Sequence, residues 1–322
     1  MLPEVRTWLR DATTAAADWS PPALAAAKGT ARVSVVLPAY NERRTVGSIV
    51  AAIRGSLMQA QPLVDEIVVI DSRSTDDTAR VAAAAGAQVF AQDDVLARLR
   101  PESGKGEALW KSLAVTTGDL IVFLDADVRN FSPSFVTGLL GPLLTDPGIS
   151  FVKASYDRPL ERSADSGGRV TELVARPLLN LHWPHLAGFI QPLSGEYAAR
   201  RAVLERVPFF TGYGVELGLL VDLFEAHGLA AMAQVDLGTR VHSHQGTAAL
   251  GRMSSQIMWT AWSRLQRHGQ IVASGEPTAL LTQFRRNAGG HHADVSDVSV
   301  AQRPPMIEIH EYLAARMLAA DA

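Results

Sequence analysis

The sequence contains no cysteine, and this absence excludes several kinds of chemistry at once. A chain without thiols forms no disulfide bonds, holds no thiolate-ligated metal and has no cysteine nucleophile. The absence fits a reducing compartment, so we expect a cytoplasmic protein. Long apolar runs are missing too, and residues 1–30 lack the basic start and apolar core of an export signal. We therefore expect a soluble protein with no membrane span.

Positive charge is limited in amount and in kind. The formal net charge of -3 gives no basic footprint, so we expect no nucleic-acid partner. The basic residues are nearly all arginine, and lysine stands only at positions 28, 105, 111 and 153. Because an arginine- and alanine-rich composition can reflect the coding DNA, a single arginine is a weak sign of function. Each lysine is individually more informative.

The pattern of apolar residues predicts an α/β fold. Hydrophobic residues make up 47% of the 322 residues and charged residues 20%, which is ordinary for a folded protein with a sizeable core. Short apolar runs predict strands, and amphipathic stretches between them predict helices. Such alternation predicts a mainly parallel sheet with helices on both faces. We expect strands at 32–37, 66–70, 88–90 and 120–124, and helices at 46–53, after 74–78 and at 107–115.

The second half of the sequence has a less regular pattern. Its longest signals are a helix at 250–267 and an apolar helix at 216–227, and the tail from residue 274 is predicted as loop with a weak helix from Pro305. In the first half, Ser74 and Asp77 have the spacing of a capping box, which predicts a helix start. Further elements are expected at 132–144 (helix), 150–153 (strand), 169–179 (helix), 191–197 (strand and loop) and 232–237 (strand).

Polar residues follow three of the predicted strands. Tyr40, Asn41 and Glu42 follow the first, Asp71 and Ser72 end the second, and an Asp-Ala-Asp sequence at 125–127 follows the fourth. In open parallel sheets, ligands bind beyond the carboxyl ends of the strands. Three polar strand ends at one edge therefore predict a binding site there.

Asp125 and Asp127 are the most informative pair. Side chains alternate along a strand, so both carboxylates should leave it on the same side. Two charges held so close repel each other unless a cation is near. Mg²⁺ or Mn²⁺, with a diphosphate as a further ligand, is the natural choice for oxygen ligands. The alternative is an acidic strand-to-loop turn in which Asp127 caps a local backbone group.

Several motifs resemble those of a known family. Residues 35–42, 71–78 and 125–127 resemble the nucleotide-sugar signatures of GT-A-fold glycosyltransferases. The segments 104–110, 167–179, 191–199 and 212–218 are more narrowly similar to the glucosyl-3-phosphoglycerate synthase family, which has mannosyl-3-phosphoglycerate synthases as close relatives. The resemblance covers most of residues 30–260. It implies a Rossmann-like, mainly parallel sheet flanked by helices and a less regular C-terminal half that binds the acceptor.

The resemblance also implies an activity and its partners. The expected reaction transfers glucose from UDP-glucose to the 2-hydroxyl of 3-phosphoglycerate, with retention at the anomeric carbon and a requirement for Mg²⁺ or Mn²⁺. Relatives suggest a homodimer. The implied division is an N-terminal arm (1–30), a nucleotide-sugar-binding half (31–128), an acceptor-binding and metal-completing half of the same domain (129–270) and a C-terminal tail (271–322).

The resemblance implies a set of site residues. Asp127 and His242 would bind the metal, and Asp127, Glu216 and Lys105 would carry the catalysis. The donor would contact Pro38, Ala39, Tyr40, Glu42, Ser72, Arg73, Ser74, Lys105, Asp125, Ala126, Asp127, Leu193 and Glu216. The acceptor would contact Gly168, Arg169, Val170, Thr171 and His244.

Two departures from the family and several alternatives bear on this assignment. The family often has glycine where Arg73 stands, and His-Arg-Asn where residues 242–244 read His-Ser-His. His242 could equally be a surface histidine, Lys105 a turn residue, and Glu216 a charge that complements a helix dipole. The residues leave open glucose or mannose, and UDP or GDP. Two rival functions are a polyprenyl-phosphate sugar transferase and a non-catalytic nucleotide-sugar-binding protein.

Overall fold

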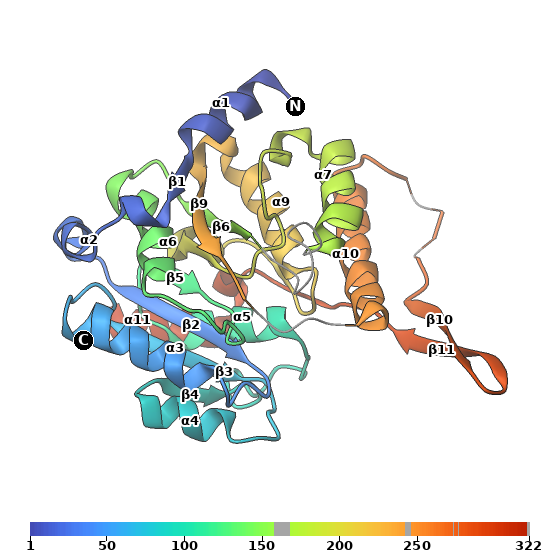
Figure 1. Cartoon of the computed structure of the whole chain (residues 1–322), viewed down its shortest axis with the longest axis horizontal. Helices are drawn as coiled ribbons and strands as arrows, with labels where there is room; N and C mark the ends of the chain where they lie inside the picture. Colours follow the sequence, from blue (N-terminus) through green and yellow to red (C-terminus); the bar gives the residue numbers. More distant parts are fainter. Residues whose placement is uncertain (158–167, 242–245, 273, 276, 321–322) are drawn as a thin grey trace.

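A mixed eight-stranded sheet forms the centre of the fold in the computed structural model, which describes residues 1–157, 168–241, 246–272, 274–275 and 277–320. The strand order is β1-β9-β6-β7-β5-β2-β3-β4 (Figure 1). All neighbouring strands are parallel except β7, which runs antiparallel to both β5 and β6. The strands are β1 (Thr13–Ala15), β2 (Val33–Ala39), β3 (Glu66–Asp71), β4 (Gln88–Ala91), β5 (Leu120–Phe123), β6 (Phe151–Asp157), β7 (Tyr197–Arg200) and β9 (Met232–Thr239).

Helices cover both faces of this sheet and create two hydrophobic cores. One core packs α2, α3, α4 and α6 against the sheet, and the other packs α5, α7, α9 and α10 with parts of α1 and α11. The helices are α1 (Pro3–Asp11), α2 (Pro21–Lys28), α3 (Val46–Ile53), α4 (Thr78–Ala85), α5 (Lys105–Val115), α6 (Ser134–Thr145), α7 (Arg176–His182), α8 (Arg201–Leu204), α9 (Val215–His227), α10 (Thr247–Arg267) and α11 (His310–Ala320).

The strand β5 shows how the sequence serves both cores. Leu120 and Val122 lie in the core with α3 and α6, whereas Ile121 and Phe123 lie in the core with α5 and α9. Successive side chains point to opposite faces of a strand, so a continuous apolar run is what a doubly covered strand requires. The predicted α/β architecture and a buried strand at 120–124 are therefore confirmed.

The N-terminal segment contributes to the sheet as well as covering it. Strand β1 pairs in parallel with β9 at the sheet edge. In α1, Trp8 is 7% exposed, and its Nε1 atom donates a hydrogen bond to the backbone oxygen of Met232 at 2.7 Å. The short helix expected here is present. The edge strand β1 was not predicted, because three residues are too few to show a strand pattern.

The predicted capping box at Ser74 is wrong. Helix α4 begins at Thr78, and its N-cap residue Asp77 makes no side-chain capping bond. The Ser74 hydroxyl instead accepts a hydrogen bond from the backbone N–H of Asn41 at 2.9 Å. Asp76 accepts from the backbone N–H of Thr78 at 2.9 Å. Ser74 therefore braces two loops at the sheet edge rather than a helix terminus.

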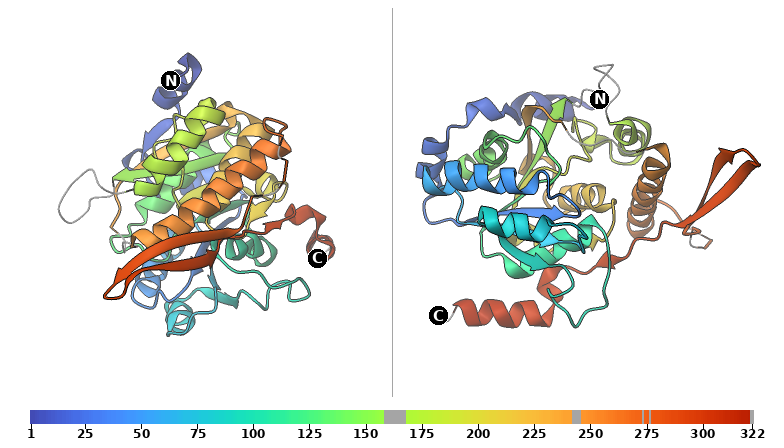
Figure 2. Two further views of the ribbon diagram at one scale, coloured as in Figure 1. Left: turned by 90° about the vertical axis from the view of Figure 1, so that its right-hand side faces the viewer. Right: turned by 60° about the horizontal axis from the view of Figure 1, so that its bottom comes forward.

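The C-terminal tail contains a hairpin where a loop was predicted. Strands β10 (Leu280–Asn287) and β11 (Gly290–Asp297) pair antiparallel and project away from the body of the molecule (Figures 1 and 2). The chain then returns as β12 (Gln302–Arg303), which pairs with β8 (Phe209–Phe210). The Asn-Ala-Gly-Gly sequence at 287–290 was the available turn signal.

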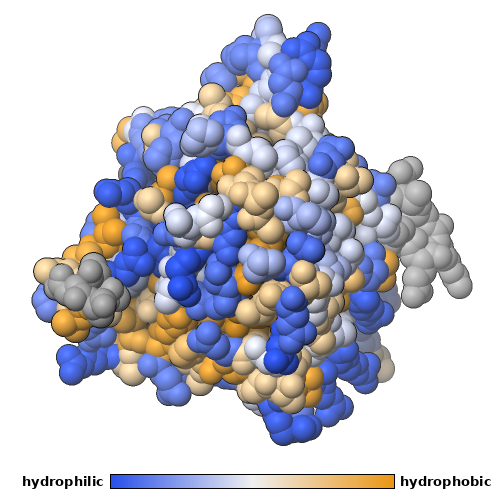
Figure 3. All heavy atoms as spheres, turned by 90° about the vertical axis from the view of Figure 1, so that its left-hand side faces the viewer, coloured by the Kyte–Doolittle hydropathy of each residue, from blue (hydrophilic) through white to orange (hydrophobic). Residues whose placement is uncertain are grey.

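Two surface observations complete the fold. On the face shown in Figure 3, hydrophilic and hydrophobic residues are interspersed. Among the residues that the structure describes, no helix combines the length and the apolar character needed to cross a membrane.

Candidate active site

A cavity of about 1210 Å³ opens beyond the carboxyl ends of β2, β3 and β5. Almost all the donor, acceptor and catalytic residues that the resemblance implied line it. Of these, Ser74 is the one described residue outside the lining, and His242 and His244 lie outside the described residues. The predicted residues in the lining are Pro38, Ala39, Tyr40, Glu42, Ser72, Arg73, Lys105, Asp125, Ala126, Asp127, Gly168, Arg169, Val170, Thr171, Leu193 and Glu216.

Hydrogen bonds hold the ends of β2 and β3 together at the cavity. Ala39 pairs with Asp71 across the two strands, and the N–H of Ser72 donates to the backbone oxygen of Ala39 at 2.8 Å. Asn41 adopts a left-handed backbone with φ of 58°, and its side-chain oxygen accepts from the N–H of Thr75 at 2.8 Å. Asparagine tolerates this conformation better than most residues. The loops after both strands are thus fixed against each other.

Arg73 occupies a position that normally favours glycine. Its φ is 66°, in the left-handed region that is strained for residues with a side chain. The backbone geometry therefore accounts for the glycine that the family often has here. The guanidinium forms a two-bond ion pair with Asp93, with Nε–Oδ2 at 2.7 Å and Nη2–Oδ1 at 2.9 Å. Arg73 thus lies at the cavity wall but is bound to Asp93 just beyond β4.

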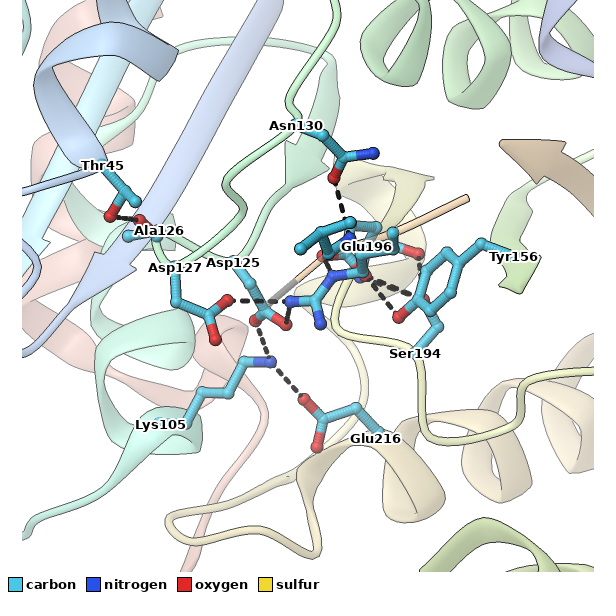
Figure 4. A network of polar contacts seen from close by, with 12 residues as sticks. Thr45, Lys105, Asp125, Ala126, Asp127, Asn130, Tyr156, Ser194, Glu196 and Glu216 are labelled. Carbon is cyan, nitrogen blue, oxygen red and sulfur yellow. Dashed lines mark hydrogen bonds and ion pairs between the residues drawn. The ribbon is translucent and has the colours of Figure 1, made fainter. Parts of the chain in front are cut away.

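Asp125 and Asp127 do lie on the same side of the chain, as predicted, and protein cations neutralise part of their charge (Figure 4). Asp125 is bound through both oxygens, by Lys105 Nζ at 2.5 Å and by Arg240 Nη2 at 2.7 Å. The same Arg240 nitrogen donates to Asp127 Oδ1 at 2.9 Å. Arg240 was not among the predicted site residues, because only its position shortly after a predicted strand could have marked it.

Asp127 keeps an excess of negative charge. Among the described residues, its Oδ2 atom accepts no hydrogen bond. The pKa of Asp127 is raised to about 6, chiefly by burial and then by the charge of Asp125, and Arg240 offsets part of the rise. Burial also raises the pKa of Glu42, with Asp127 as the next contributor. A divalent cation at Asp127 would relieve this repulsion.

The described residues provide only part of a metal site. No group of three or more histidine, aspartate or glutamate side chains among them is arranged to hold a metal ion. The predicted ligand His242 follows directly on Val241, whose N–H donates to the Asn130 side chain at 2.8 Å and whose oxygen accepts from the N–H of Arg129 at 3.0 Å. These bonds attach the chain before His242 to the loop that follows Asp127.

Lys105 lies between two carboxylates at the start of α5. Its Nζ atom is 2.5 Å from Asp125 Oδ1 and 2.8 Å from Glu216 Oε1 (Figure 4). Burial alone would lower the pKa of Lys105, but the charges of Asp125 and Glu216 outweigh it and raise the pKa well above its usual value. Gly104, with φ of 104°, makes the turn that places Lys105 there. Lys105 is therefore a permanent cation in the cavity rather than a turn lysine.

A second polar group supports Arg240 from behind. Arg240 Nε donates to Glu196 Oε1 at 2.8 Å, and Glu196 is fully buried. The other oxygen of Glu196 accepts from the Tyr156 hydroxyl at 2.7 Å, and Ser194 Oγ lies 3.1 Å from the same oxygen (Figure 4). A buried carboxylate with this many partners is stable, so Glu196 fixes the guanidinium that binds the aspartate pair.

The predicted acceptor residues line the same cavity at the start of a helical stretch. Gly168 has φ of 80° and precedes a continuous helical stretch over residues 169–182. Val170 and Thr171 are buried, while Arg169 is exposed. A glycine-preceded helix start with an arginine is suited to an anion, because N–H groups and a planar guanidinium face it together. The structure brings these residues and the aspartate pair to one cavity.

The C-terminal segment forms a wall that the sequence did not predict. Asp297, Ser299, Val300 and Ala301 line the cavity, and the Ala301 oxygen accepts from the N–H of Thr211 at 2.9 Å. The returning chain is anchored next to α5. Its Arg303 side chain binds both carboxylate oxygens of the fully buried Glu107 at 2.7 Å.

The fold and the site together define a glycosyltransferase of the GT-A type, and the family described as glycosyl transferase family 2 matches residues 34–195. The chain is 49% identical to glucosyl-3-phosphoglycerate synthase from Mycolicibacterium smegmatis over 303 residues, which are 93% of this chain and 97% of the relative. It therefore belongs to the glucosyl-3-phosphoglycerate synthase family.

Solved structures agree with this membership. Mannosyl-3-phosphoglycerate synthase from Rubrobacter xylanophilus has a TM-score of 0.89 at 40% identity, covering 94% of this chain and 99% of that one. Glucosyl-3-phosphoglycerate synthase from Mycobacterium tuberculosis, in complex with Mn²⁺, UDP-glucose and phosphoglyceric acid, has a TM-score of 0.79 at 47% identity, covering 90% and 95%.

Proposed function

We propose that this protein transfers glucose from UDP-glucose to the 2-hydroxyl of 3-phosphoglycerate, with retention at the anomeric carbon. The observation that carries the proposal is a single cavity that joins the Asp125–Asp127 pair to the 168–171 segment. Supporting it, the mycobacterial relatives are glucosyl-3-phosphoglycerate synthases, and one of them binds UDP-glucose and phosphoglyceric acid.

Asp127 would hold a divalent cation, Mg²⁺ or Mn²⁺, together with His242. The fit rests on the excess negative charge at Asp127 and Glu42, whose pKa values are raised by burial and then by neighbouring carboxylates. Asp125, bound to two protein cations, would contact the ribose or lie outside the ligands of the metal. When bound, the cation would stabilise negative charge on the leaving diphosphate.

The remaining donor contacts follow from the strand ends. Pro38, Ala39, Tyr40 and Glu42 would flank the uracil and ribose, because they continue directly from β2 into the cavity. The segment 72–73 would lie along the nucleotide, with Leu193 and Ala126 closing the opposite side.

Lys105 and Glu216 would act at the reacting end of the donor. The ammonium of Lys105 would approach the diphosphate, and Glu216 would hold the hydroxyls of the sugar. Their mutual ion pair at 2.8 Å fixes both side chains before a ligand binds. A preorganised pair of this kind stabilises developing charge without having to rearrange during the reaction.

The pairing of the carboxylates favours attack on the front face of the sugar. Glu216 is bound to Lys105, and both oxygens of Asp125 are bound to cations, so neither is placed as a nucleophile among the described residues. The leaving phosphate oxygen would then take the proton of the acceptor hydroxyl. The protein contributes positioning and electrostatic stabilisation.

The acceptor phosphate would be held by the start of the helical stretch 169–182. Gly168 lets the backbone approach closely, Val170 and Thr171 supply N–H groups, and Arg169 supplies a guanidinium. His244 would complete the acceptor contacts. These residues come from a different element than the strand ends that would bind the donor.

Three wider expectations belong to the same proposal. The nucleotide-sugar-binding half at 31–128 and the acceptor half at 129–270 act as one domain, because the sheet runs through both. We further propose a homodimer and a cytoplasmic location. The latter is supported by the charged substrates, which do not cross lipid bilayers unaided.

A product assay tests the proposal. The purified protein is incubated with 3-phosphoglycerate, Mn²⁺ and one of UDP-glucose, GDP-glucose or GDP-mannose, and the product is identified by mass spectrometry. We expect glucosyl-3-phosphoglycerate, with UDP-glucose as the preferred donor. Preference for GDP-mannose would replace the proposal with mannosyl transfer, which the likeness to the Rubrobacter enzyme favours as the second candidate. No transfer with any donor would overturn it, and polyprenyl phosphate in place of 3-phosphoglycerate serves as the control acceptor.

A further inference from the structure

Lys153 is a buried lysine that forms no ion pair with the described residues. It lies on β6 with 1% of its surface exposed, and its Nζ atom donates to the backbone oxygen of Ser194 at 2.9 Å. The ammonium also lies 4.6 Å from the ring centroid of Tyr197. Burying an ammonium away from water is unfavourable unless its surroundings compensate. The contacts of the loop that accepts this hydrogen bond indicate what Lys153 holds in place.

Gly195, the residue after Ser194, contacts the ion pair between Lys105 and Asp125. A Cβ atom added to Gly195 would overlap Lys105 Nζ and both carboxylate oxygens of Asp125. The backbone at Gly195 therefore packs directly against the Lys105–Asp125 ion pair, and only glycine permits this approach. A small shift of this backbone would move the ammonium that pairs with Glu216.

The next residue, Glu196, leads to the other cation. Glu196 binds Arg240, which in turn binds Asp125 and Asp127. The 194–196 loop thus contacts Lys153 through its first residue, the Lys105–Asp125 pair through its second, and Arg240 through its third. Among the described residues, both cations that bind the aspartate pair, Lys105 and Arg240, are in contact with this loop.

We propose that Lys153 is a positioning residue for sugar transfer, fixing the 194–196 loop so that Lys105 and Arg240 hold the aspartate pair in its reactive arrangement. This inference rests on the proposed function. It assigns a role to a side chain that does not line the cavity.

The charge of Lys153 is part of this arrangement. The groups that face it are Glu216 on α9, Lys105 on α5, Glu196 in the loop before β7, and Asp125 after β5. The pKa of Lys153 is lowered to about 7, chiefly by burial, with the charge of Glu216 opposing the shift and that of Lys105 adding to it. A neutral lysine would still donate to Ser194, so the hydrogen bond persists over a wide pH range.

Lys111 provides a control at a second buried lysine. It is also 1% exposed, and its Nζ atom also donates to a backbone oxygen, that of Gln92 at 2.8 Å. Unlike Lys153, it also lies 3.5 Å from Glu107 Oε1. The test compares Lys153→Met, Lys153→Gln, Gly195→Ala and Lys111→Met in the full chain. Thermal unfolding, kcat and KM for both substrates, and calorimetric binding of UDP with Mn²⁺ are measured for each.

We expect Lys153→Met to lower kcat by roughly a hundredfold, as a misplaced reacting group does, with a smaller change in KM for 3-phosphoglycerate. Lys153→Gln, which keeps a hydrogen-bond donor, should recover part of the lost kcat. Gly195→Ala should lower kcat in the same way, because its added Cβ would displace the Lys105–Asp125 pair. Lys111→Met should lose stability but keep the kcat of the unmodified protein.

Two results would overturn the inference. One is an unchanged kcat in Lys153→Met or in Gly195→Ala, and the other is equal loss of kcat in Lys111→Met. If Lys153→Met does not fold, Gly195→Ala and Lys153→Gln decide. The calorimetric measurement separates this inference from the proposed function. Weakened binding of UDP with Mn²⁺ in the Lys153 variants and in Gly195→Ala, but not in Lys111→Met, would support the positioning role, whichever sugar is transferred.

Discussion

The two halves of the sheet bring opposite charges to the cavity. The strand ends of β2 and β5 contribute carboxylates, Glu42, Asp125 and Asp127. Arg240 directly follows strand β9, in the other half, and β6 holds Lys153 behind the 194–196 loop. The division is not complete, because Lys105 at the start of α5 also binds Asp125, and the second half holds the Glu196 carboxylate. Among the described residues, however, Asp127 is bound only by Arg240, a cation 113 residues away in the sequence.

The largest effect is expected from removing Arg240, the cation of one half of the sheet that binds carboxylates of the other. Arg240→Met should lower the free energy of unfolding by about 3–5 kcal/mol, because it leaves the buried Glu196 carboxylate without its guanidinium. Chemical denaturation measures the loss. Arg264→Met is the control, since Arg264 is equally buried and binds Asp222 far from the aspartate pair.

The control distinguishes folding from function. Both variants should lose stability, but only Arg240→Met should also weaken binding of UDP with Mn²⁺ below the unfolding transition. Unchanged stability of Arg240→Met would contradict the view that the second half of the sheet holds the carboxylates of the first.

A smaller effect is expected at Arg169, where a substitution should separate acceptor binding from donor binding. Arg169→Ala should raise KM for 3-phosphoglycerate by the equivalent of about 1.5–3 kcal/mol, the worth of a charged hydrogen bond, and leave UDP-glucose affinity nearly unchanged. Arg169→Lys should recover only part, because lysine lacks the planar fork. Steady-state kinetics with each substrate varied in turn measures both constants.

Lys105→Met is the reciprocal variant. It should weaken donor binding more than acceptor binding, since Lys105 pairs with Asp125 and Glu216 on the donor wall. Equal damage to both substrates in Arg169→Ala would indicate a folding role for the 168–171 segment. No damage to either would place the acceptor phosphate elsewhere.

The smallest expected effect is a pH dependence of stability that belongs to Lys153. Its pKa is lowered to about 7 from an ordinary value of 10.5, chiefly by burial. Between these values the unfolded chain binds more protons than the folded one, so stability should rise with pH. The contribution is at most about 1.4 kcal/mol per pH unit. Urea unfolding from pH 7 to 9 should show this slope in the unmodified protein, reduced in Lys153→Met. Parallel curves for the two proteins would contradict it.

Local patterns predicted most of the first half. The apolar face of α3 over residues 46–53 and the buried run of β5 were visible because helix and strand periodicities act over a few residues. The aspartate pair was visible because it follows that strand directly. Arg240, Glu196 and Lys153 were not visible, since each acts through a partner that only the folded chain brings near.

The prediction of a loop in the C-terminal tail was wrong for a related reason. Hairpin β10–β11 has mostly exposed residues on both faces, so it lacks the alternation of a half-buried strand. The return of the chain to the cavity at 297–303 depends on Arg303 binding Glu107, a contact across 196 residues. Sequence patterns therefore located the carboxylates of the site, and tertiary contacts supplied the cations and one wall.

Metal binding by Asp127 tests the central claim most directly. Among the described residues, only one oxygen of Asp127 is bound, which leaves its other oxygen for a divalent cation, whereas Asp125 is already bound through both oxygens. Calorimetric and electron paramagnetic resonance titrations with Mn²⁺ and UDP would compare the unmodified protein with Asp127→Asn and Asp125→Asn. We predict that Asp127→Asn abolishes Mn²⁺ binding and Asp125→Asn only weakens it. Unchanged Mn²⁺ affinity in Asp127→Asn would contradict the account.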